Sequence, residues 1–118
     1  MAKDPRESLN ELGKGLTALK KADSQRMQAF NNFIQATTKP GVLDSKTKHL
    51  ISLAISLYTH CEHCIVAHTN EALEAGATRE ELIETAFVIV SMGGGPAIAY
   101  SATLLVDAIN TFAPDYGK

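Results

Sequence analysis

The chain has 118 residues, of which 45% are hydrophobic, and its formal net charge at pH 7 is -2. This size suits one domain, taken as residues 1–118, with enough apolar side chains for a core. The near-neutral charge argues against nucleic-acid binding, and the apolar stretches are interrupted before the roughly 20 residues of a membrane span. Residues 1–6 contain no apolar signal core, so we expect a cytoplasmic protein with neither nucleic-acid nor membrane partners.

Helical spacing dominates the first half of the chain. Leucines three and four residues apart between positions 9 and 19 predict a first helix with one apolar stripe. Asp23 or Ser24 is expected to cap a second helix, whose side chains at 27, 30, 33 and 34 face inward. A third helix begins at Asp44 and is apolar almost all round from 50 to 58, which predicts a central, buried position.

The second half continues the helical pattern and shows no strand-like alternation. A fourth helix occupies residues 61–75, and we place its break from the third near residues 59–60, because one uninterrupted helix would be unusually long. Thr-Arg-Glu-Glu at 78–81 is a capping box that opens a fifth helix. Gly-Gly-Gly-Pro at 93–96 separates it from a sixth. These patterns predict an all-α fold of about six helices. Because the helices have more apolar faces than one small core can bury, we also expect a homo-oligomer.

The segment that carries reactive side chains is Cys61-Glu-His-Cys64-Ile-Val-Ala-His68. On a helix, Cys61, Cys64 and His68 fall within about 60° of one another, and His68 lies one turn beyond Cys64. A thiol reacts as its thiolate, which a helix N-terminus stabilises and a nearby imidazole helps to form. A second cysteine converts the oxidised one into a disulfide before over-oxidation. The pattern therefore predicts a thiol redox centre.

Other interpretations of these residues remain open. Cys61, Cys64 and His68 could supply three zinc ligands, although structural zinc sites usually draw their ligands from two separated segments. The candidates for a fourth ligand are His49, His60 and His63. Buried cysteines also occur simply as small hydrophobic residues. The glycine run at 93–96 lacks the preceding strand and following lysine of a phosphate-binding loop, so helix punctuation or close packing explains it better.

Several segments together resemble the carboxymuconolactone decarboxylase superfamily, and most closely its alkylhydroperoxidase D-like branch. They are residues 43–50, the Cys-x-x-Cys-x-x-x-His run at 61–68, residues 71–84, and Gly-Gly-Gly-Pro-Ala at 93–97. The resemblance covers about residues 25–110. It implies an all-α fold that assembles as a homo-oligomer, either a trimer or a hexamer. It also implies a peroxiredoxin-type enzyme that reduces alkyl hydroperoxides.

The resemblance further implies a role for each residue of the motif. Cys64 matches the cysteine that attacks the peroxide, Cys61 matches the resolving cysteine, and His68 matches the histidine that deprotonates the nucleophile. Helix-dipole logic alone favours Cys61 as the more acidic thiol, but His68 lies nearer Cys64, so we choose Cys64. An external dithiol carrier, in some members a lipoylated protein, recycles the disulfide. Neither a cofactor nor a metal is expected.

One position departs from the family pattern. The pattern has a glutamate twelve residues before the first cysteine, where this chain has His49. A chain reversal near residues 59–60 would bring His49 back beside Cys64 and His68, so we include it among the catalytic residues. The enzymatic alternative is a gamma-carboxymuconolactone decarboxylase-type enzyme, against which the retained cysteine pair argues. The non-enzymatic alternative is a zinc-stabilised or purely structural oligomer.

Overall fold

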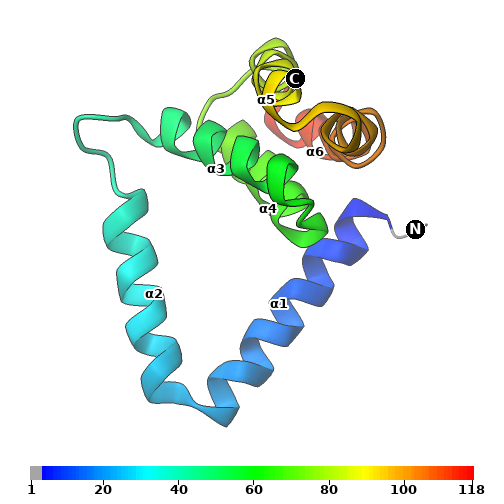
Figure 1. Ribbon diagram of the computed structural model, residues 1–118. Coiled ribbons are helices and arrows are strands. Elements are labelled where there is room, and N and C mark those ends of the chain that lie inside the picture. Colours follow the sequence, from blue (N-terminus) through cyan, green and yellow to red (C-terminus); the bar gives the residue numbers. More distant parts are fainter. Residues whose placement is uncertain (1–3) are drawn as a thin grey trace.

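The computed structural model describes residues 4–118, so the first three residues of the charged N-terminus lie outside the described residues. The helices α1 (Pro5–Ala22) and α2 (Ser24–Thr38) form a V-shaped arm that projects from a helical body (Figure 1). The body contains α3 (Ser45–Thr59), α4 (Glu62–Glu74), α5 (Arg79–Tyr100), a π-helical segment (Ser101–Leu105), α6 (Val106–Phe112) and a 3-10 turn (Ala113–Tyr116). Residues 4–118 include no strand, which confirms the all-α prediction.

Polar side chains begin three of the helices where the sequence predicts caps. The carboxylate of Asp23 accepts the backbone N–H of Arg26 at the start of α2, and that of Asp44 accepts the backbone N–H of Thr47 at the start of α3. The predicted capping box at the start of α5 is complete, with Thr78 and Glu81 each accepting the other's backbone N–H. Each bond satisfies a donor that the helix itself leaves unpaired.

The predicted break between α3 and α4 is also present. Helix α3 ends at Thr59 because His60 adopts a left-handed conformation, with φ 59° and ψ 38°. This single-residue turn lets α4 return along α3, and the two helices lie side by side (Figure 1). Residues from the first half of α3 are thereby brought next to residues in the middle of α4.

The predicted fifth and sixth helices are joined, so the described chain has five helical runs rather than six separate helices. Residues 79–116 continue through α5, the π-helical segment and α6 without an intervening loop. A kink remains at Gly94, whose φ of 64° and ψ of -143° suit glycine alone. At Gly93 a Cβ would lie 3.4 Å from the ring of Tyr58, so α3 approaches α5 closely there. The glycine run therefore serves both kinking and close packing.

The core lies between α3, α4, the start of α5 and the C-terminal helices. Its largest fully buried side chains are Phe112, Leu53, Leu57, Ile65, Leu73, Leu82 and Leu105. Burying a side chain of this size stabilises the fold by about 1.5–3 kcal/mol. Because α3 and α4 both contribute to this core, their relative position is fixed by packing, and so is the position of polar side chains between them.

The expectation that the apolar faces of the arm and of α3 point inward is wrong at several positions. On α2, Phe30 is 51% and Phe33 is 64% exposed, whereas Met27 is buried. On α3, Ile51 and Ile55 are exposed. For α2, the physical reason is that this helix packs chiefly on α1 and touches the body little. The radius of gyration of 14.5 Å accordingly exceeds the roughly 13.5 Å expected for a compact chain of this length.

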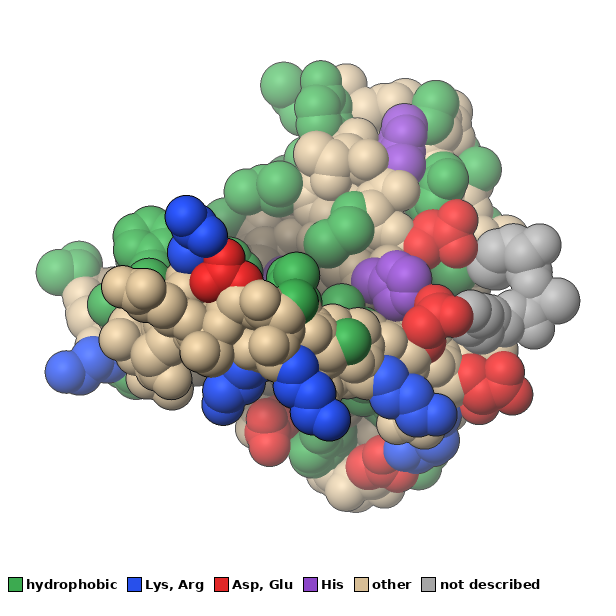
Figure 2. Space-filling model, turned by 90° about the horizontal axis from the view of Figure 1, so that it is seen from below, with side chains coloured by type: hydrophobic (Ala, Val, Ile, Leu, Met, Phe, Trp, Pro, Cys, Tyr) green, Lys and Arg blue, Asp and Glu red, His purple; other side chains and the backbone are tan. Residues whose placement is uncertain are grey.

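The run 79–116 also leaves apolar surface uncovered. By length and composition alone this run could cross a bilayer, since an 18-residue window within it has a mean hydropathy of 1.6. Only 17% of that window is buried within the chain. It is kinked at Gly94, and α5 packs against α3 in the helical body. Figure 2 shows hydrophobic side chains around a hollow on the face seen from below. A single copy of the chain therefore leaves large apolar side chains of this run exposed, among them Phe87, Val88 and Met92.

Candidate active site

The two cysteines stand at the start of α4. Cys61 is the residue that precedes the helix, with an extended backbone, and Cys64 lies in its first turn. They are joined by a disulfide, with an S–S distance of 2.05 Å and a Cα–Cα distance of 5.2 Å. Both residues are partly buried. The structure thus brings the predicted pair into bonding contact.

The backbone around the cysteines favours a negatively charged sulfur. The side chain of Cys61 makes no capping hydrogen bond to the backbone N–H groups in the first turn of α4. These groups carry the positive end of the helix dipole, which stabilises an anion by about 0.3–1 kcal/mol. A thiolate at Cys64 would lie within this first turn.

His68 lies one turn beyond Cys64 on α4, and its side chain is 28% exposed. Its Nδ1 is 3.3 Å from Oε1 of Glu71, but this buried nitrogen has no well-aligned hydrogen-bond partner. The polar contact with His68 is the main cause that lowers the pKa of Glu71, with a smaller contribution from the charge of His49, whereas partial burial opposes the shift. Glu71 is therefore a carboxylate at neutral pH.

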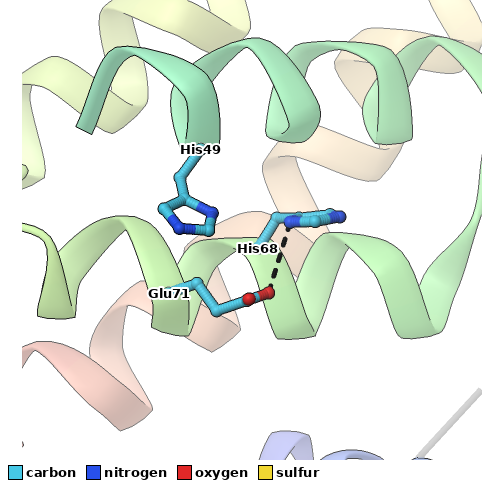
Figure 3. A group of neighbouring side chains, drawn as sticks. All are labelled: His49, His68 and Glu71. Atoms are coloured by element: carbon cyan, nitrogen blue, oxygen red, sulfur yellow. Dashed lines mark ion pairs between the residues drawn. The ribbon is translucent and has the colours of Figure 1, made fainter. Parts of the chain in front are cut away.

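His49 approaches this pair from the neighbouring helix. Its ring centroid is 6.2 Å from that of His68, with the two planes tilted by 36°. Figure 3 shows the His49 side chain descending from α3 toward His68 and Glu71 on α4. The reversal at His60 thus has the predicted geometric effect of placing His49 beside His68. One ligand-type atom from each of these three residues lies within 4.8 Å of the others.

Glu71 is the residue of this cluster that the sequence analysis missed. The available signal was its spacing of three residues from His68, which places both on one face of a helix. The family pattern has a glutamate at the position of His49. In this chain a carboxylate still faces His68, but it comes from α4 instead of α3.

The remaining histidines have partners outside the cluster. The ring of His60 stacks on Tyr100, with 5.0 Å between centroids and 8° between planes. Nε2 of His63 lies 2.8 Å from a carboxylate oxygen of Glu11 on α1. Of the three histidines considered as an additional zinc ligand, His49 is therefore the one placed against His68.

A surface groove of about 620 Å³ lies beside the first turn of α4. Its lining includes Glu62, which follows Cys61 directly, together with Tyr100, Thr103 and Asp107. The π-helical segment Ser101–Leu105 forms part of its wall. Such irregular helical turns are often found at functional sites. Neither cysteine lines this groove, whose link to the cysteine pair is Glu62, the residue that follows Cys61.

Residues 25–107 match the carboxymuconolactone decarboxylase family. This match spans most of the chain, so the chain belongs to the carboxymuconolactone decarboxylase family. An uncharacterised protein of Cupriavidus necator is 36% identical over 112 residues, which cover 93% of this chain and 99% of that relative.

Two relatives carry the name alkyl hydroperoxide reductase AhpD. The protein of Nocardia farcinica is 34% identical over 85 residues, which cover 71% of this chain and 43% of the relative. The protein of Corynebacterium aurimucosum is 48% identical over 46 residues, which cover 39% of this chain and 25% of the relative. The chain thus spans less than half the length of either AhpD protein.

Solved structures share the whole fold. A carboxymuconolactone decarboxylase family protein from Legionella pneumophila superposes with a TM-score of 0.85 at 34% identity, over 99% of this chain and 100% of that one. A family protein from Thermotoga maritima gives a TM-score of 0.73 at 25% identity, over 92% and 95% of the two chains. The aligned residues therefore include the projecting arm as well as the helical body.

Proposed function

We propose that the protein is a thiol-dependent peroxidase of the alkylhydroperoxidase type. The observation that supports this most directly is the cysteine pair itself, disulfide-bonded at the start of α4 with His68 one turn further on. Two AhpD-named relatives point in the same direction. The decarboxylase activity of the family's name finds no comparable support, because its chemistry gives the cysteine pair no role.

The proposed reaction begins with reduced protein. His68 accepts the proton of Cys64, and the thiolate attacks the terminal oxygen of a hydroperoxide. An S–O bond forms while the O–O bond breaks, and the alkoxide leaves as an alcohol after receiving the proton from His68. Cys64 is then a sulfenic acid. The thiol of Cys61 attacks its sulfur, water leaves, and the disulfide forms.

His49 and Glu71 assist this step through His68. The carboxylate of Glu71, ionised because its pKa is lowered, favours the protonated imidazole that results from proton transfer. His49 lies close enough to exchange a proton with His68 through one water molecule. We propose that this pair takes over the relay for which the family pattern uses a glutamate at position 49.

The cycle closes when an external dithiol reduces the disulfide. Two electrons from the dithiol return Cys61 and Cys64 to thiols and leave the carrier as a disulfide. We propose the groove beside Glu62 as the approach for this carrier, since it borders the first turn of α4. The reaction fits the cytoplasm, where such carriers are kept reduced.

Peroxide consumption by purified, prereduced protein tests the proposal. With excess dithiol, the wild type should consume hydroperoxide, and Cys64→Ser should lose all turnover. Cys61→Ser should react once, leaving a sulfenic acid that a dimedone-type reagent traps on Cys64. Metal analysis runs on the same sample. Stoichiometric zinc without turnover, or turnover that survives in Cys64→Ser, would overturn the proposal.

We also propose that further copies of the chain cover the exposed apolar faces. The exposed apolar side chains on α2, α3 and α5 include Phe30, Phe33, Ile51, Ile55, Phe87, Val88 and Met92. They lie on α2 of the projecting arm, on α3 and on the long C-terminal run, so they span both the arm and the body. This proposal accounts for the apolar window of residues 79–116 without a membrane.

A further inference from the structure

Three side chains that commonly bind metals converge between α3 and α4. His49 comes from α3, and His68 and Glu71 come from α4 (Figure 3). One potential ligand atom from each lies within 4.8 Å of the other two, and none of the three residues is fully exposed. Two imidazoles and one carboxylate form a donor set found in zinc enzymes that keep a fourth position open.

The contact between His68 and Glu71 supports a ligand at this point. Nδ1 of His68 is 3.3 Å from Oε1 of Glu71, yet this buried nitrogen lacks an aligned hydrogen bond. Zinc binds nitrogen and oxygen at about 2.0–2.2 Å, so two ligands of a tetrahedral ion lie about 3.4 Å apart. The two atoms thus have the spacing of neighbouring ligands, and a metal ion would supply the buried nitrogen with the well-aligned bond that it lacks.

We propose that His49, His68 and Glu71 bind one divalent transition-metal ion of the zinc class. Their ligand atoms lie within 4.8 Å of one another, so the side chains would have to draw these atoms together to the spacing of about 3.4 Å around a bound ion. The carboxylate offsets part of the charge of the ion, and a water molecule completes the coordination. This site differs from a zinc site on the cysteines, since it exists while Cys61 and Cys64 are joined in the disulfide.

The site has a consequence for the peroxidase. A metal ion on His68 occupies the imidazole lone pair that proton transfer from Cys64 requires, so the metal-bound and peroxidase-competent states exclude each other. This consequence rests on the proposed function, whereas metal binding itself does not. Binding is therefore tested on the disulfide form of the protein, in which no peroxide chemistry takes place.

The test is a titration of the oxidised, full-length protein with zinc in competition with a chromophoric chelator. The wild type should bind one ion per chain. Glu71→Gln should weaken zinc binding at least about tenfold, because loss of even an indirect partner of a metal typically costs 10–100-fold. Glu74→Gln is the matched control, since it removes the same charge from an exposed position on the same helix.

A second pair of variants keeps the test decisive if Glu71→Gln folds poorly. His49→Asn should weaken zinc binding, and His63→Asn should leave it unchanged, because His63 contacts Glu11 instead. Zinc should also raise the thermal midpoint of the wild type and of the two controls, but not of the two site variants. Equal affinity in Glu71→Gln and Glu74→Gln, or loss of binding in His63→Asn alone, would overturn the assignment.

Discussion

Replacing His68 with alanine removes the imidazole one turn beyond Cys64 and leaves the start of α4 intact. A positioned general base contributes about 10²–10⁴-fold to a rate, so we expect peroxide consumption by His68→Ala to fall by that factor. The helix N-terminus remains, but its 0.3–1 kcal/mol corresponds to only about a 2–5-fold stabilisation of the thiolate. The residual helix effect is thus too small to hide the loss of His68.

The assay measures initial rates at pH 7 with prereduced protein, excess dithiol and a metal chelator. Alkylation of Cys64 by iodoacetamide, in a Cys61→Ser background, reports the reactivity of the thiol without peroxide. His63→Ala is the matched control, because it removes a histidine next to Cys64 in sequence whose ring contacts Glu11. Equal rates for His68→Ala and His63→Ala in both assays would refute the general-base role.

The remaining predictions concern stability and assembly. Thr78→Ala removes the cap of α5 and should cost about 0.5–2 kcal/mol in urea unfolding at pH 7, a loss that an unchanged midpoint would contradict. The pKa of Glu81 is lowered, mainly by the backbone N–H of Thr78 and then by Lys46. The stabilisation by ionised Glu81 is therefore fully present above the pKa of about 4.3 that a glutamate has in the unfolded chain, and it is lost as the pH falls through the lower pKa of the folded state. The difference in unfolding free energy between wild type and Glu81→Gln should therefore shrink with acidification. Phe112→Ala opens a cavity in the core and should cost about 3–5 kcal/mol, measured by denaturant unfolding. Phe87→Glu should lower the assembled mass in light scattering while helix content is unchanged, and a wild type that is already monomeric at micromolar concentration would disprove the assembly proposal.

Local features of the fold could be predicted because neighbouring residues alone specify them. The caps at Asp44 and Thr78 depend on side chains that bond to backbone within three residues, and the turn near His60 follows from helix length. The alignment of Cys64 with His68 follows from the 3.6-residue period of a helix. The contact between His68 and Glu71 follows from the same period, because residues three apart lie on one face of a helix.

The tertiary structure decided which helix faces are covered and how the helices meet. The distance between His49 and His68 depends on the packing of α3 against α4 through core residues such as Leu53 and Ile65, which are remote in sequence from each other. The exposure of Phe33 depends on how far α2 projects from the body, which no local pattern encodes. An apolar stripe predicts that one face of a helix is buried. The helix or chain that covers this face is set by long-range packing within the chain and between chains.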